Sequence, residues 1–125
     1  MSFASMAPAF FSTDMERTFK FWSALGCEAR RYDDTFMILE HPIGFGLMFG
    51  LDAELDPAAN KTNAYLRFTT KDEVVALHDE WTVHVPTTRS EAAFIGAPEE
   101  TAWGTFEWPL LDPDSNLLRV GTRLG

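Results

Sequence analysis

The chain has 125 residues, of which 46% are hydrophobic and 14% aromatic, which indicates one folded domain and excludes a disordered chain. It carries 19 acidic against 10 basic side chains, a formal net charge of −9, so nucleic acid and an anionic membrane are poor partners. The same negative field attracts cationic small molecules, although acidity can also serve solubility alone.

The beginning of the sequence predicts a strand followed by a helix. The strand runs from Phe3 to Ser12 and contains Pro8, which cannot donate a hydrogen bond within a central ladder. The segment Thr13–Glu16 has the spacing of a capping box, which predicts a helix from Asp14 to Leu25 that ends at Gly26. The apolar face of this helix comprises Met15, Phe19, Trp22 and Leu25.

Three short strands are predicted next, separated by turns. Asp33-Asp34 marks the first turn, and Pro42 with Gly44 marks the second. The polar segment Leu55–Thr62 then indicates a linker. The three strands are Glu28–Tyr32, Phe36–Glu40 and Phe45–Leu51.

The order of strand, capping box and helix then recurs. Asn63–Phe68 predicts a strand, and Thr70 to Glu73 predicts a second capping box, 57 residues after the first. This spacing, about half the chain, indicates an internal repeat of two βαβββ modules in one domain, about residues 1–54 and 62–125. The apolar face of the second helix comprises Val74, Leu77, His78 and Trp81.

The last third of the sequence predicts strands and a tight turn. A strand is expected over Thr82–Val85, and the loop-rich stretch Thr87–Glu100 has room for a short helix. Two further strands, Trp103–Leu111 and Leu117–Thr122, flank the turn Asp112–Asn116. Proline at the second turn position pre-sets φ, and Asp and Asn tolerate tight conformations, so this segment predicts a β-hairpin.

These pieces, in this order, resemble the glyoxalase/bleomycin resistance protein/dioxygenase (vicinal oxygen chelate) superfamily, and most nearly its bleomycin-resistance proteins. The resemblance implies an α+β fold of two βαβββ modules that form a curved half-barrel of mixed sheet. It also implies a homodimer in which an arm, Ser2–Ala9, is exchanged at Pro8. Ser115 departs from the glycine usual in this turn. The resemblance is carried by Pro8, Phe21-Trp22, Leu25-Gly26, Phe36–Leu39, Ala64–Leu66, Trp81, Trp103-Gly104 and Asp112–Asp114.

The resemblance also places the four positions at which metal-dependent members hold a divalent ion. Such ions need His, Glu or Gln at those positions, because they bind nitrogen and oxygen donors that face one cavity. Here the positions fall on Ala7, Met48, Asn63 and Arg119, so we expect no metal and no other cofactor.

The histidines and the cysteine are explained by structural or surface roles. His41, His78 and His84 are not spaced as ligands, and we expect structural or surface roles for them. The single cysteine, Cys27, excludes an internal disulfide and fits a reducing compartment, where it packs as a small hydrophobic group. No apolar run approaches the roughly 18 residues of a membrane span, and no basic export signal precedes one, so we expect a cytoplasmic protein.

A candidate ligand site follows from the resemblance. Its concave sheet would expose Phe36, Phe49, Tyr65 and Trp103 either to a planar ligand or to packing and dimer contacts. Gly104 beside Trp103 would let a ligand approach the backbone closely. Asp34 is either a solvated turn charge or a carboxylate at the groove rim that holds an ammonium group.

The expected function is therefore metal-free sequestration of a planar or cationic drug such as bleomycin, in a groove between two subunits and with no catalytic residues. Two alternatives stay open at this point. One is a lyase, isomerase or dioxygenase-like enzyme of the same fold. The other is a regulatory module that binds a metabolite in the same groove.

Overall fold

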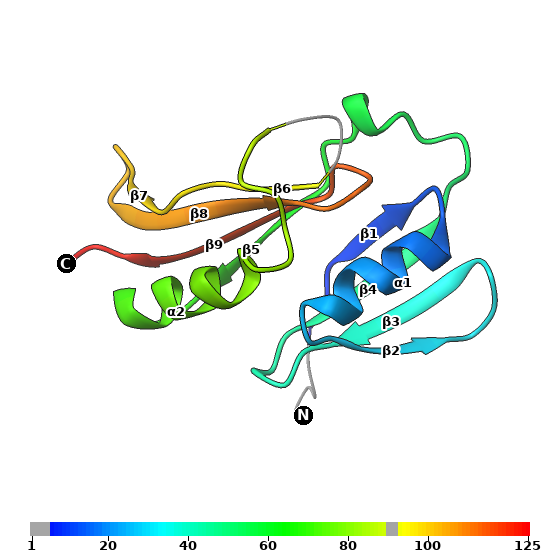
Figure 1. Ribbon diagram of the computed structural model, residues 1–125, viewed down its shortest axis with the longest axis horizontal. Helices are drawn as coiled ribbons and strands as arrows, with labels where there is room; N and C mark the ends of the chain where they lie inside the picture. The colour runs from blue at the N-terminus through cyan, green and yellow to red at the C-terminus, as the bar shows by residue number, and fades with distance from the viewer. Residues whose placement is uncertain (1–5, 90–92) are drawn as a thin grey trace.

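The computed structural model describes residues 6–89 and 93–125, which form two sheets with one α-helix on each (Figure 1). The first sheet has the order β1 (Ala9–Ser12), β4 (Gly46–Leu51), β3 (Phe36–Glu40), β2 (Glu28–Arg31). The second has the order β5 (Asn63–Arg67), β9 (Leu117–Arg123), β8 (Thr105–Leu111), β6 (Phe94–Ile95), with β7 (Glu99–Glu100) also paired to β8. The helices are α1 (Met15–Ala24), α2 (Lys71–Trp81) and the short η1 (Pro57–Ala59).

The two sheets are built in the same way. In each, the first strand pairs in parallel with the last, β1 with β4 and β5 with β9, while the hairpin strands pair antiparallel. The helix carries the chain from the first strand across the sheet, and the antiparallel strands that follow bring the last strand back beside the first. The predicted α+β class with mixed sheets is confirmed.

The helices begin close to where the sequence predicts. Thr70 caps α2, and its hydroxyl accepts from the Glu73 amide at 3.3 Å. The capping residue of α1 is Asp14 and not Thr13 as predicted: the Asp14 carboxylate accepts from the Arg17 amide at 3.1 Å. Gly26 ends α1 with φ of +97°, a conformation that a Cβ atom disfavours.

One predicted strand is absent from the structure. The segment Thr82–Val85 forms turns that extend from α2, because the amides of His84 and Val85 both donate to the Trp81 carbonyl. In the predicted loop 87–100, residues 90–92 lie outside the described residues, and the described remainder contains β6 and β7 but no helix.

The core joins the two sheets through tryptophans. Trp81 of α2 lies edge-on to Trp22 of α1 at 6.3 Å and to Trp108 of β8 at 5.8 Å between ring centres. Its indole nitrogen donates to the Leu25 carbonyl at 3.1 Å, so the polar atom of this buried ring is satisfied. Cys27 is buried as expected, and burial raises the pKa of its thiol to about 12.

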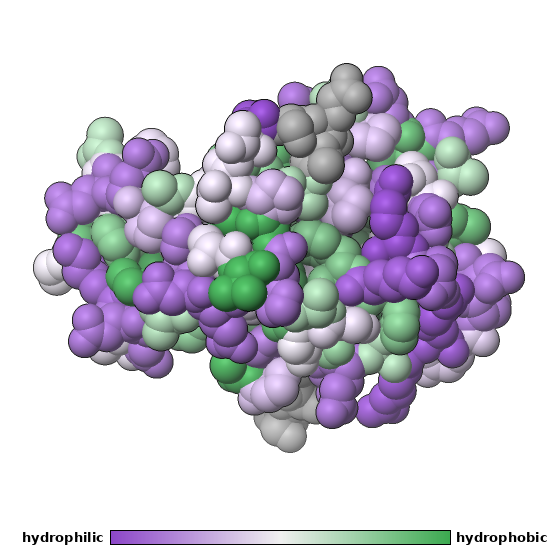
Figure 2. Space-filling view, in the orientation of Figure 1, coloured by the Kyte–Doolittle hydropathy of each residue, from purple (hydrophilic) through white to green (hydrophobic). Residues whose placement is uncertain are grey.

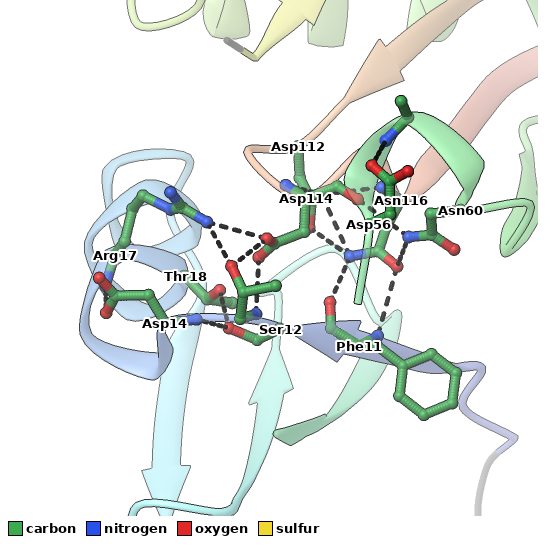
Figure 3. A network of polar contacts seen from close by, with 12 residues as sticks. Phe11, Ser12, Asp14, Arg17, Thr18, Asp56, Asn60, Asp112, Asp114 and Asn116 are labelled. Carbon is green, nitrogen blue, oxygen red and sulfur yellow. Dashed lines mark hydrogen bonds and ion pairs between the residues drawn. The ribbon is translucent and has the colours of Figure 1, made fainter. Parts of the chain in front are cut away.

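The turn between β8 and β9 ties the second sheet to the first (Figure 3). Asp114 is fully buried and accepts from the amide and hydroxyl of Thr13, at 3.2 and 2.5 Å, and from Arg17 at 2.8 Å. Asn116 forms hydrogen bonds with both backbone groups of Phe11, donating to the carbonyl at 2.7 Å and accepting from the amide at 3.3 Å. We call Asp112, Asp114 and Asn116 the turn clamp.

The face seen in Figure 2 is dominated by hydrophilic side chains, with apolar ones gathered near its middle. No helix within residues 6–89 and 93–125 is long and apolar enough to cross a membrane.

Candidate functional site

The open face of the second sheet, on the side away from α2, carries a polar cluster in an apolar sheet. Strand alternation puts Tyr65 of β5, Glu107 of β8 and Arg119 of β9 on this face, while Leu66, Trp108 and Val120 point toward the core. A cavity of about 540 Å³ opens over it. The cavity is lined by Glu99, Thr101, Trp103, Glu107, Pro109, Leu117 and Arg119.

Arg119 is the central side chain of this cluster. Its Nε and Nη2 atoms donate to one oxygen of Glu107 at 3.1 and 2.6 Å. Its guanidinium carbon lies 5.1 Å from the centre of the Tyr65 ring and 5.8 Å from that of Trp103, which is within cation–π range. The ion pair and the two rings therefore fix one guanidinium group at the cavity wall.

Glu107 is held as a carboxylate by its neighbours. Burial alone would raise its pKa, but hydrogen bonds from Arg119, Thr105 and Tyr65, together with the charge of Arg119, outweigh burial and lower it. The hydroxyl of Thr105 donates to the second carboxylate oxygen at 2.8 Å. For Tyr65, burial and the hydrogen bond to Glu107 raise the pKa of the phenol, so it remains a hydrogen-bond donor at neutral pH.

Trp103 is the most accessible aromatic group in the cavity. It lies in the turn before β8 and is 68% exposed. Gly104 follows it with φ of +89°, and a Cβ atom there would meet no described atom within 4 Å. Glycine therefore serves the backbone conformation of the turn that presents Trp103, because no neighbouring atom of the described chain would collide with a side chain at position 104.

The other predicted site residues lie on the first sheet. Phe36 is half-buried on its open face, against the exposed Tyr32 at 5.7 Å between ring centres. Asp34 lies in the turn before β3 with its side chain 97% exposed, 3.4 Å from Arg31. Neither residue lines the cavity beside Trp103.

Phe49 requires a correction. It was expected on the concave face but is completely buried on the opposite face, packed against Phe10 and Trp22 at 5.7 and 6.1 Å between ring centres. Its neighbours Met48 and Gly50 occupy the open face, because successive residues of a strand point to opposite sides.

Solved structures with the same fold include proteins that bind bleomycin. A bleomycin-binding protein complexed with bleomycin is 30% identical, with 97% of this chain and 99% of that chain covered and a TM-score of 0.85. The bleomycin resistance determinant encoded on the transposon Tn5 is 29% identical over 97% of this chain and 98% of that chain, also with a TM-score of 0.85. The chain belongs to the glyoxalase/bleomycin resistance protein/dioxygenase family.

A third structure, the bleomycin-binding protein of bleomycin-producing Streptomyces verticillus complexed with copper(II)-bleomycin, is 23% identical. The alignment covers 100% of this chain and 98% of that chain with a TM-score of 0.76, so the two proteins share the fold. No family model and no curated protein matches the chain. The predicted resemblance is confirmed by the solved structures alone.

The residues at the metal positions of this family do not fit a divalent ion. Ala7 and Asn63 line a second cleft of about 600 Å³, Met48 lies on the first sheet, and Arg119 lines the cavity. A guanidinium group repels a cation, and the nearest carboxylate, Glu107, is already engaged by that group. Across the described residues, no three His, Cys, Asp or Glu side chains are arranged to hold a metal.

Sequence reasoning missed Glu107, Thr105 and Gly121. Gly121 leaves the space that the Tyr65 hydroxyl occupies. A signal was present, because Thr105 and Glu107 alternate with Phe106 and Trp108 along β8. Polar residues on one face of an otherwise apolar strand indicate a polar open face. The partner of Glu107 could not be inferred, since it depends on the register of β8 with β9.

Proposed function

We propose that this protein binds a planar small molecule and sequesters it without chemical change, and that bleomycin-type glycopeptides are its ligand class. The observation that carries the proposal is the exposed ring of Trp103 on a cavity wall in a chain 30% identical to a bleomycin-binding protein over almost its whole length. An exposed aromatic ring can stack a planar ligand.

The proposal includes a homodimer with two-fold symmetry. The open face of the first sheet has an apolar part, where Phe11, which is exposed, lies beside the half-buried Phe36, Ile38 and Met48. An uncovered apolar sheet face favours association. If this face meets the second sheet of a partner subunit, Phe36 and Asp34 come to lie near the partner's Trp103 and Tyr65, and the groove takes a planar cation.

The exchanged arm also remains a proposal. Ser2 to Ser5 lie outside the described residues. In the single chain, the Pro8 carbonyl accepts from the Met48 amide at 2.9 Å, and Ala9 pairs with Met48. The strand that follows Pro8 is paired within its own chain, so we propose that the exchanged part of the arm is the segment before Pro8.

The enzyme alternative receives less support. A lactoylglutathione lyase shares the fold at 13% identity and a TM-score of 0.68, which concerns the fold alone. Arg119 stands where metal-dependent members carry a ligand, and the described residues supply no replacement donor set. We therefore propose binding without catalysis.

The test is calorimetric titration with metal-free bleomycin. We expect binding by the unmodified protein and a loss of about 1–3 kcal/mol of affinity in Trp103→Ala, the range of a central aromatic anchor. Val83→Ala, at an exposed residue outside the cavity, is the matched control. Absence of binding would remove bleomycin as the ligand, and binding that ignores Trp103 would move the site elsewhere.

A further inference from the structure

Arg119 uses only one edge of its guanidinium group within the protein. Nε and Nη2 both donate to Glu107, and Nη1 makes no hydrogen bond to any residue that the structure describes. A guanidinium group carries five N–H donors in a planar fork, so the edge formed by Nη1 and Nη2 retains donors for a second acceptor. Arg119 lines the cavity with 34% of its side chain exposed, so a ligand can supply that acceptor.

This edge is held in place before a ligand arrives. Glu107, whose side chain is only 10% exposed, fixes the inner edge, and the rings of Tyr65 and Trp103 flank the group. A donor that is already ordered loses little conformational freedom on binding, which favours both affinity and direction. Trp103 is one of the flanking rings, so a planar ligand stacked on it lies beside an ordered pair of donors.

The charges of the cavity select among acceptors. Glu99 of β7 lies directly opposite Glu107 of β8, and both carboxylates line the cavity with Arg119, which leaves one negative charge in excess. None of the ion pairs between described residues involves Glu99. A ligand carboxylate would be repelled by Glu99. A carboxamide can accept from Arg119 through its oxygen and donate to a carboxylate through its nitrogen.

We propose that Arg119 is the specificity-determining residue of this cavity and that the cavity takes planar heteroaromatic carboxamides. The ring lies against Trp103, and the amide oxygen accepts from the outer edge of Arg119. This inference rests on the proposed function, because it names the chemical class that the same cavity binds.

Three probes with one ring system test it: quinoline, quinoline-3-carboxamide and quinoline-3-carboxylate, titrated by NMR, with metal-free bleomycin measured in parallel. We expect the carboxamide to bind about tenfold more tightly than quinoline, as for a hydrogen bond to a charged group, and more tightly than the carboxylate. Arg119→Lys keeps a positive charge beside Glu107 but lacks the planar fork, so the preference should fall to about twofold or less.

Arg123→Met is the control, because Arg123 lies on β9 outside the cavity, and it should retain the preference. If Arg119→Lys does not fold, the double variant Arg119→Met, Glu107→Met removes both charges together and should also lose the preference.

Equal binding of quinoline and its carboxamide would overturn this inference, while bleomycin binding would leave the proposed function standing. Tighter binding of the carboxylate would overturn the ligand class. A preference that survives in Arg119→Lys would overturn the assignment to Arg119. Failure of all three probes and of bleomycin would overturn both proposals.

Discussion

Gly121 lies where the open face of the second sheet has no room for a side chain. A Cβ atom there would overlap the Tyr65 hydroxyl and lie 2.6 Å from the Glu107 Cβ and 2.8 Å from the Phe106 carbonyl oxygen. The Phe106 carbonyl belongs to β8, which is paired to β9 along its whole length, so it cannot move without disturbing the ladder. Gly121→Ala must therefore displace Tyr65 and separate the two strands locally.

The cost can be worked from these contacts. Overpacking costs about 1–3 kcal/mol, and loss of the hydrogen bond between Tyr65 and Glu107 adds roughly 1 kcal/mol. Replacing glycine by alanine restricts the unfolded chain and returns about 0.4–1 kcal/mol. We expect Gly121→Ala to lower the free energy of unfolding by about 1–3 kcal/mol.

Gly50 of β4 provides a matched control with the opposite expected sign. A Cβ atom at Gly50 meets no described atom within 4 Å, so Gly50→Ala should stabilise the protein by up to about 1 kcal/mol. Urea unfolding followed by tryptophan fluorescence measures both variants. If Gly121→Ala is as stable as Gly50→Ala, the packing of Tyr65 against Gly121 and Glu107 is not as described.

Two further predictions concern the turn between β8 and β9. Burial raises the pKa of Asp112 to about 6, above the unfolded value, so the native state binds this proton more strongly and the free energy of unfolding should fall as pH rises from about 4 to about 6. Urea unfolding across this range should show a weaker fall in Asp112→Asn, and an identical pH profile would contradict the assignment. Ser115 has φ of +63°, so Ser115→Gly should raise the free energy of unfolding by up to about 1 kcal/mol, and thermal unfolding without an increase in Tm would show that the serine is not strained.

The elements that could be predicted from the sequence are those governed by local physics. The apolar face of α1 and the cap at Thr70 depend on residues within one or two turns of the helix. One failure involves a distant partner, and a second lies in the local backbone after α2. Thr13 does not cap α1, because its hydroxyl donates to Asp114, far away in the sequence, and accepts from the Arg17 guanidinium at 2.9 Å. The Arg17 amide donates to Asp14 instead. Val83 is exposed although it alternates with polar residues as in a strand, because the segment continues the turns after α2.

The candidate site was predictable only in part for the same reason. Tyr65 and Trp103 are recognisable as aromatic groups on strands or turns of a concave sheet, and the structure places both beside Arg119. The prediction for Phe49 is wrong, because a one-residue error in the alternation of β4 moves every side chain of the strand to the opposite face. The pairing of Glu107 with Arg119 could not be predicted, because it depends on the strand register, which places the two residues diagonally across from each other.

The turn between β8 and β9 carries much of the resemblance to the family, and it contributes to the site by fixing the position of β9. Asp114 and Asn116 bind Thr13 and Phe11, and β9 begins directly after them, so the clamp fixes where β9 starts relative to the first sheet. Two residues into that strand lies Arg119, whose pairing with Glu107 depends on the resulting register. A sequence feature that bears no ligand-binding group thus positions the charged centre of the cavity. Substitutions in the clamp should accordingly change ligand affinity together with stability, whereas those at Trp103, which is exposed, should change affinity alone.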